Sequence, residues 1–279
     1  MSVILSIDFG TSATKIAGLS PDGSILFTLR TAIPAQSPNL REELNACLTA
    51  YSLSLHDMQN IVLTGTGAAY VDSDTMGTSI CKVDEFSASC AGALALSGQE
   101  QAVIATLGTG TAFLWADNKG TIRHLCGTGI GGATLCGLSE HLFGISDVCQ
   151  IDALASQGNL SNVDLTIADI TRNPPPTLDL SLTAANFGKL TKSLSPADLA
   201  AGTANLVLQS IGTMTVLACQ CCDCRTVVLT GSLTAMTQAK TNFETFERLY
   251  GIHYIIPEHA AFATAIGAGL CSLRQKSAD

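Results

Sequence analysis

The segment from Asp8 to Lys15 has residue types suited to binding a phosphate group. An aspartate at the end of an apolar run is followed by a glycine turn and small hydroxyl residues. Asp8 could hold Mg²⁺ directly or through water, and the backbone N–H groups of Gly10 to Ser12 could bind phosphate oxygens. Lys15 is placed to neutralise phosphate charge. The segment is not a P-loop, because the G-x-x-x-x-G-K-[ST] spacing is missing, and a plain β-hairpin turn is the alternative.

Three later segments also combine glycine with hydroxyl residues at a strand end. They are 107–111 (L-G-T-G-T), 127–134 (G-T-G-I-G-G-A-T) and 231–233 (G-S-L). The second runs into an expected helix start, and a helix N-terminus after a glycine-rich loop binds anions. Its glycine spacing does not fit a dinucleotide fingerprint, and no βαβ unit precedes it. Four such loops together predict a nucleotide held between two lobes.

Glu85 is the candidate general base. It lies in K-V-D-E-F at 82–86, just before an expected helix. A carboxylate near a γ-phosphate can accept the proton of an attacking hydroxyl group. The alternative is that Asp84 and Glu85 only stabilise the helix N-terminus electrostatically. The five histidines show no triad spacing and no G-x-S-x-G segment occurs, which argues against a hydrolase.

A unit of strand, glycine turn, strand, turn and strand occurs twice, starting near residues 3 and 102. This repetition predicts two related α/β lobes, each with its own phosphate-facing hairpin. Apolar periodicity predicts the remaining elements. The expected strands are 2–9, 14–19, 24–29, 61–64, 102–107, 111–116, 121–125 and 226–230, and the expected helices are 41–55, 85–96, a long one capped by Ser195, and 257–273.

Composition narrows the class of protein. Hydrophobic residues make up 47% and charged residues 13% of the 279 positions, which argues against disorder. The net charge of −9 argues against a nucleic-acid surface, but backbone N–H groups can still bind a small anion. We find no secretory signal and no run of about 18 apolar residues, so we expect a cytoplasmic protein without a membrane partner.

Eleven cysteines are many for this length, and the expected cytosolic location favours reduced thiols. The one dense group is Cys219, Cys221, Cys222 and Cys224. It could hold zinc or a cluster, yet no second C-x-x-C pair or histidine pair completes a site. The group is therefore interpreted as a thiol-rich helix end.

Several segments, in order along nearly the whole chain, resemble type II pantothenate kinases. The phosphate loop alone indicates only the wider superfamily of actin, sugar kinases and heat-shock chaperone ATPases. K-V-D-E-F with the later segments makes the resemblance specific. The matching segments are 8–15, 82–86, 107–111, 127–134, 182–189, 229–232 and 258–268.

The resemblance implies a two-lobed actin-like ATPase (ribonuclease H-like) fold, with duplicated mixed sheets and flanking helices. It implies a homodimer that uses ATP to phosphorylate pantothenate to 4'-phosphopantothenate, the first step of coenzyme A biosynthesis. The lobes would be 1–95 and 96–279, with the last helix able to pack back on the first lobe.

By position, the resemblance makes Glu85 the catalytic base and Asp8 the residue that holds Mg²⁺. The residues implied to bind ATP are Asp8, Phe9, Gly10, Thr11, Ser12, Ala13, Thr14, Lys15, Thr109, Gly132, Ala133, Thr134, Leu135, Cys136 and Ser232.

The chain departs from the family pattern at two places. The family holds pantothenate with an arginine three residues before the glycine that matches Gly127; here that position is His124, and Arg123 lies one residue earlier. Neighbouring strand residues point to opposite faces, so Arg123 could substitute only if a bulge re-aims it. Both are candidate substrate residues. The milder departure is Phe9-Gly10-Thr11, where the family usually has a glycine pair.

Three alternatives stay open. A kinase of a sugar or amino sugar would use the same fold. An ATP-driven activator protein with an iron–sulfur cluster would make Cys219 to Cys224 functional. A catalytically silent regulator would bind ATP without turnover.

Overall fold

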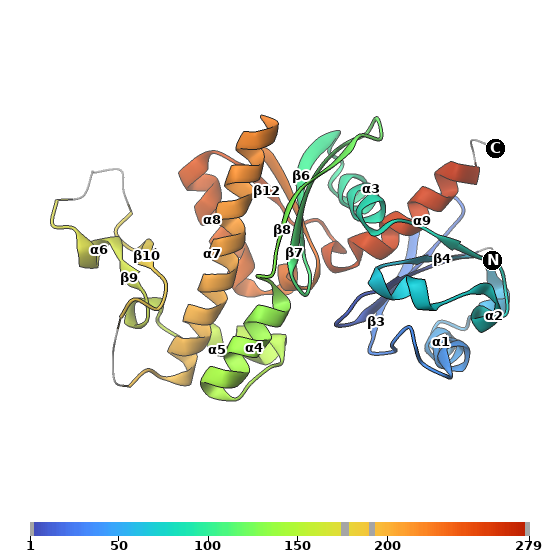
Figure 1. The fold of residues 1–279 in the computed structure, drawn as a ribbon, viewed down its shortest axis with the longest axis horizontal. Helices are drawn as coiled ribbons and strands as arrows, with labels where there is room; N and C mark the ends of the chain where they lie inside the picture. Colours follow the sequence, from blue (N-terminus) through green and yellow to red (C-terminus); the bar gives the residue numbers. More distant parts are fainter. Residues whose placement is uncertain (1–2, 174–178, 190–192, 277–279) are drawn as a thin grey trace.

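Two five-stranded mixed sheets form the two lobes of the computed structural model, which describes residues 3–173, 179–189 and 193–276 (Figure 1). In each sheet three antiparallel strands are followed by two parallel ones. This duplication confirms the expected two-lobed α/β fold. The first sheet has the order β3 (Ile25–Thr31), β2 (Thr14–Leu19), β1 (Val3–Phe9), β4 (Met58–Thr64) and β5 (Ile80–Lys82); the second has the order β12 (His253–Ile255), β11 (Thr226–Thr230), β6 (Gln101–Leu107), β7 (Thr111–Asp117) and β8 (Ile122–Thr128).

The helices that cover the inner faces of the sheets are exchanged between the lobes. α9 (Ala263–Lys276), from the end of the chain, packs on the first sheet, whose other face is covered by α1 (Leu40–Thr49). α3 (Glu85–Ser97) instead packs on the second sheet. The outer face of the second sheet is covered by α4 (Gly132–Phe143), α5 (Val148–Ala155), α7 (Pro196–Cys222) and α8 (Thr237–Tyr250). Smaller elements are α2 (Ser73–Met76), α6 (Ile167–Ile170), β9 (Leu165–Thr166) and β10 (Thr183–Ala185).

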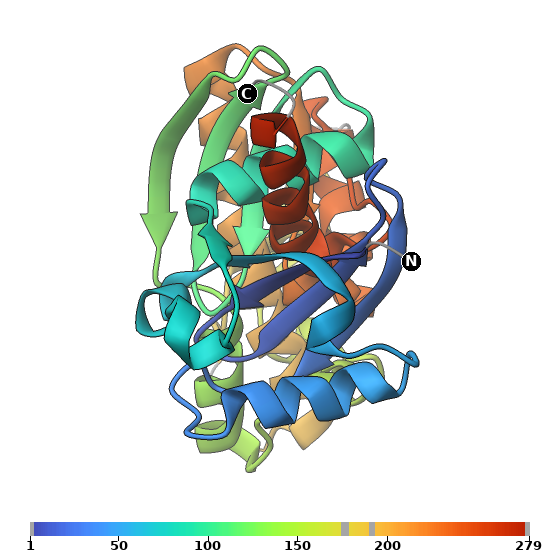
Figure 2. The ribbon, with the colours of Figure 1, turned by 90° about the vertical axis from the view of Figure 1, so that its right-hand side faces the viewer.

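α3 and α9 lie side by side between the sheets, and their backbones touch (Figure 2). A Cβ at Gly92 would lie 1.9 Å from the carbonyl oxygen of Ala263, and one at Gly267 would lie 1.8 Å from that of Ala88. The hydroxyl groups of Ser89 and Thr264 are hydrogen-bonded at 3.0 Å beside this crossing. The inner layer therefore depends on two glycines, one from each helix.

α7 begins as the sequence predicts. The backbone N–H of Asp198 donates to Oγ of Ser195, and Pro196 is the first helical residue. Among the described helices, α7 alone is long and apolar enough to cross a membrane by length and composition. Its buried side, which includes Val207 and Ile211, packs in the core of the second lobe.

Two expected helix boundaries were wrong. The helix expected over 41–55 ends at Thr49, because the chain turns through a left-handed conformation at Ser52 (φ 56°). The helix expected from Pro257 begins at Ala263, since His259 is also left-handed (φ 59°). The sequence prediction also missed the three-residue edge strands β5 and β12, which are too short to show periodicity.

Candidate active site

The first glycine turns of the two lobes touch. Residues 10–13 join β1 to β2, residues 108–110 join β6 to β7, and the hydroxyl groups of Ser12 and Thr109 are 2.8 Å apart. Gly10 and Thr11 form no hydrogen bond with any described residue. Their N–H groups are therefore free to donate to a ligand where the lobes meet.

The turn of the second lobe is held by the start of α4. The N–H of Gly132 donates to the carbonyl of Gly108 at 2.8 Å, and that of Ala133 donates to the carbonyl of Thr109 at 3.0 Å. The hydroxyl of Thr134 donates to Gly129 O at 2.7 Å. The anion site expected at this helix N-terminus therefore lacks its first two N–H donors, which position the turn instead.

Ser232 follows β11 at the same edge of the second sheet. Gly231 has a φ of 93°, and a Cβ there would lie 2.4 Å from the carbonyl oxygen of Leu107. Only glycine allows this approach without strain. The approach places Ser232 beside the turn that carries Thr109.

Asp8, Lys15 and Glu85 form the charged centre of the site. Asp8 and Lys15 are direct partners across β1 and β2, and Glu85 is the first residue of α3. Asp8 is only 6% exposed, and its carboxylate makes no hydrogen bond or ion pair within the described residues. A buried carboxylate that accepts no hydrogen bond is costly even with the charge of Lys15 nearby, so it indicates a functional site.

The pKa values of these groups show that they influence one another. Burial raises the pKa of Asp8, and the charge of Lys15 partly offsets this. Burial lowers the pKa of Lys15, against the opposing effect of Asp8. Burial also raises the pKa of Glu85, and the charges of Asp8 and Asp84 raise it further. The structure thus brings together three predicted residues from separate parts of the chain.

The surroundings of Asp8 fit a magnesium ion. The carboxylate is unpaired, and a Cβ on Gly65 would lie 2.4 Å from its Oδ1, so the β4 turn packs directly against it. Mg²⁺ takes one or two carboxylates together with phosphate oxygens and water. The free N–H groups of Gly10 and Thr11 lie in the turn that follows Asp8.

Several predicted ATP-binding residues turn their side chains away. Phe9 is buried in the core beneath α1, and Leu135 is buried in the core of the second lobe. The hydroxyl of Thr14 donates to the carbonyl of Ile33 at 2.6 Å. The side chains of these three residues are therefore not available to a nucleotide, and the N–H of Leu135 donates to the carbonyl of Gly131 at 3.0 Å. Ala13 and Cys136 are half-buried, and burial raises the pKa of the Cys136 thiol.

A β-bulge directly follows the two candidate substrate residues on β8. Phe113 pairs with Cys126 and Leu114 pairs with His124, so Leu125 is the extra residue of β8. Leu114 belongs to the core beneath α3, and His124 shares that face. The His124 ring stacks on Phe86, the neighbour of Glu85, with centroids 5.0 Å apart and planes 6° from parallel.

Arg123 lies on the opposite face of β8. It pairs with Trp115, and its guanidinium carbon lies 6.0 Å from the centre of the Trp115 ring. Trp115 packs against the core beneath α7. The bulge that was required for Arg123 to substitute is present, but it places His124 on the face of α3, against Phe86, and Arg123 on the opposite face.

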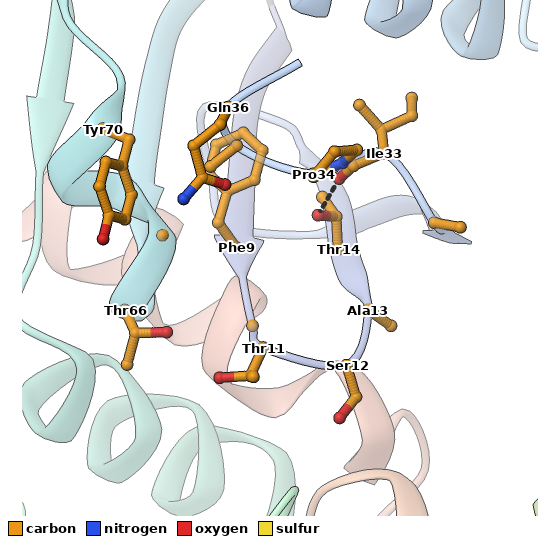
Figure 3. A pocket seen from close by; sticks show the side chains of 14 residues that line it. Phe9, Thr11, Ser12, Ala13, Thr14, Ile33, Pro34, Gln36, Thr66 and Tyr70 are labelled. Carbon is orange, nitrogen blue, oxygen red and sulfur yellow. Dashed lines mark hydrogen bonds between the residues drawn. The ribbon is translucent and has the colours of Figure 1, made fainter.

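A cavity of 390 Å³ lies against the first glycine turn (Figure 3). Its walls come from residues 9–14, 32–36 and 66–70, and the polar groups of Gln36, Thr66 and Tyr70 are part of them. Asp8, Lys15 and Glu85 do not line it. The turn is therefore accessible from a second side as well.

All eleven cysteines are free. Burial raises the pKa of both Cys90 and Cys219 to about 12, which makes these thiols unreactive at neutral pH. Among the described residues, no three His, Cys, Asp or Glu side chains are grouped as metal ligands.

Sequence reasoning missed three residues of the site: Thr64, Gly65 and Phe86. Thr64 is the strand partner of Asp8, and Gly65 contacts its carboxylate. A signal was available, because Thr64-Gly65-Thr66 and Thr230-Gly231-Ser232 repeat one pattern at equivalent strand ends. Nothing in the sequence indicated that Phe86 would stack on a strand of the other lobe.

The two-lobed architecture is the actin-like ATPase fold. An activator of 2-hydroxyisocaproyl-CoA dehydratase from Clostridium difficile, solved with bound ADPNP, superposes with a TM-score of 0.71 at 16% identity, covering 99% of this chain and 96% of that one. A ROK family glucokinase from Streptomyces griseus, solved with glucose and AMPPNP, has a TM-score of 0.60 at 13% identity. The superposition covers 96% of this chain and 98% of the glucokinase chain. At these identities the similarity concerns the fold.

The chain belongs to the Fumble family, whose model matches residues 101–270. A type II pantothenate kinase from Oceanobacillus iheyensis is 34% identical over 151 residues, which are 53% of this chain and 58% of that protein. A type II pantothenate kinase from Staphylococcus saprophyticus is 31% identical over 147 residues, which are 51% of this chain and 56% of that protein. The matches therefore span about half of this chain and of its curated relatives.

Proposed function

We propose that the protein is an ATP-dependent pantothenate kinase that forms 4'-phosphopantothenate. The observation that carries the proposal is the grouping of three charged residues: Asp8 and Lys15 are strand partners, and Glu85, the first residue of α3, interacts with the charges of both. Membership of the Fumble family and relatives named type II pantothenate kinases support the choice of substrate.

Glu85 acts as the general base in this mechanism. Its carboxylate accepts the proton of the primary hydroxyl of pantothenate as the hydroxyl oxygen attacks the γ-phosphorus of ATP. A new oxygen–phosphorus bond forms, and the bond to the bridging oxygen breaks, leaving its electron pair on ADP. The raised pKa brings this base nearer to neutrality, which suits proton transfer.

Lys15 and the N–H groups of Gly10 and Thr11 stabilise the charge of the transferring phosphoryl group. The charged form of Lys15 is favoured by Asp8 and Glu85 although burial lowers its pKa. Mg²⁺ bound with ATP would neutralise phosphate charge, and Asp8 is the carboxylate placed to hold it. The hydrogen bond between Ser12 and Thr109, one from each lobe, holds the two turns together.

The proposal extends to the assembly and location of the protein. It is a cytoplasmic homodimer that acts on a small molecule, without a nucleic-acid or membrane partner. The lobes divide at residues 95 and 96, close to the end of α3. Across this division, α9 packs back on the first sheet and α3 packs on the second.

One observation favours a second acceptor class. The β8 side chain that contacts Phe86, the neighbour of Glu85 in the sequence, is His124, a weaker carboxylate ligand than arginine. A sugar or amino sugar, which has no carboxylate, would suit this position. An ATP-coupled assay with pantothenate, sugars and amino sugars decides between the two. Turnover of pantothenate supports the first proposal, and turnover of a sugar alone would replace it by the second.

A further inference from the structure

Thr64 carries a buried hydroxyl group without a partner. It is the last residue of β4 and is fully buried, and its Oγ1 forms no hydrogen bond with any described residue. Leaving a buried hydroxyl unpaired destabilises a folded protein, so each case calls for an explanation.

The position of Thr64 beside Asp8 explains why its hydroxyl group is unpaired. Thr64 is the in-register parallel partner of Asp8. Val62, two residues earlier, packs in the core beneath α9, and alternation along the strand puts the Thr64 side chain on that same face. Asp8 shares this face, since the hydroxyl of Ser6, two residues before it, donates to Ala265 in α9. The unpaired hydroxyl and the unpaired carboxylate are therefore neighbours.

The second lobe shows what the same position does without a ligand. Thr106 and Thr230 occupy the places of Asp8 and Thr64, one residue before the end of β6 and at the end of β11. The hydroxyl of Thr230 donates to that of Thr106 at 3.2 Å. The second lobe thus satisfies this position internally, whereas the first lobe leaves both groups open.

We propose that Thr64 is a further binding residue of the nucleotide site, whose hydroxyl donates a hydrogen bond to the oxygen atom that a magnesium–nucleotide complex brings to Asp8. This inference rests on the proposed ATP-dependent function, but not on the identity of the acceptor. The stability lost through an unpaired hydroxyl in the free protein is recovered when the nucleotide binds.

The test compares Thr64→Val, Thr64→Ser and Thr230→Val with the wild-type protein. The melting temperature of the free protein and the affinity for Mg–ADP, measured by calorimetry, are the two readouts. Valine has the shape of threonine without the hydroxyl. Thr64→Val should keep or raise the melting temperature and weaken Mg–ADP binding about tenfold, the size expected for a hydrogen bond to a charged group. Thr64→Ser should retain the affinity.

Thr230→Val removes a formed hydrogen bond, so its melting temperature should fall, which calibrates the stability readout. Unchanged Mg–ADP affinity in Thr64→Val would overturn the inference. So would a fall in its melting temperature equal to that of Thr230→Val, because the hydroxyl would then have a structural partner. Failure of the wild type to phosphorylate pantothenate would reject the proposed substrate, yet the comparison of Mg–ADP affinities would still decide the role of Thr64.

Discussion

Phe86 and His124 stack in parallel, with ring centroids 5.0 Å apart and ring planes 6° from parallel. Phe86 follows Glu85 in the first turn of α3, and His124 lies on β8 of the second lobe. A pair of this kind is stabilising by about 0.5–1.5 kcal/mol beyond its buried area. The contact places an imidazole ring from the second lobe on the residue that follows the proposed base at the start of α3.

Glu85→Gln should remove turnover and retain Mg–ATP binding. The amide keeps the size of the side chain but cannot accept the proton of the acceptor, so kcat should fall by about 10²–10⁴-fold. A coupled assay measures the rate, and calorimetry measures the nucleotide affinity. A variant that keeps its rate would exclude Glu85 as the base.

The rate should also depend on pH through Glu85. The base works when ionised, and burial, Asp8 and Asp84 all raise its pKa, so kcat/KM should fall on acidification at a pH above the usual 4.5. Asp84→Asn removes one of the charges that raise this pKa and keeps a side-chain oxygen to cap α3. The acidic limb of the kcat/KM profile should therefore move to lower pH. An upward shift would contradict the assignment.

The crossing of α3 and α9 predicts a contrast between two glycines. Gly92→Ala forces a Cβ to within 1.9 Å of Ala263 O, so the helices must separate, at a cost of about 1–3 kcal/mol or more. Gly137 lies in α4 with nothing within 4 Å of a built Cβ. Gly137→Ala should stabilise by about 0.5–1 kcal/mol through helix propensity. Denaturant unfolding of both variants measures the difference, and equal effects would refute the close crossing.

Local patterns predicted the strands that carry the site. β2 and β11 have the expected bounds. The repeated unit of strand, glycine turn and strand predicted the duplicated sheets. Apolar runs ending in glycine are informative because burial and turn chemistry act within a few residues. The same reasoning predicts the phosphate-binding residues Asp8 and Lys15 and the candidate base Glu85, which the structure groups together.

What the sequence did not predict depends on contacts between distant segments. The unpaired state of Thr64 follows from its register with Asp8, and the loss of the Gly132 and Ala133 donors follows from the fit of α4 against the turn at Gly108. The bulge at Leu125 reverses which of two neighbours faces the site. Periodicity along one strand does not encode such shifts, since pairing with the next strand sets them.

That bulge leads to a test of acceptor recognition. His124→Ala removes the ring that stacks on Phe86, the neighbour of Glu85, and should raise KM for the acceptor, with little change in the affinity for Mg–ATP. Arg123→Ala is the matched control, because its guanidinium lies over Trp115 on the other face of β8. It should leave KM unchanged and cost about 0.5–1 kcal/mol of stability, the worth of an exposed cation–π contact. His124→Arg offers a carboxylate two parallel hydrogen bonds, so it should lower KM for pantothenate but not for a sugar. A rise of KM in Arg123→Ala without one in His124→Ala would reverse the assignment, and the strand would then have to shift its register when the acceptor binds.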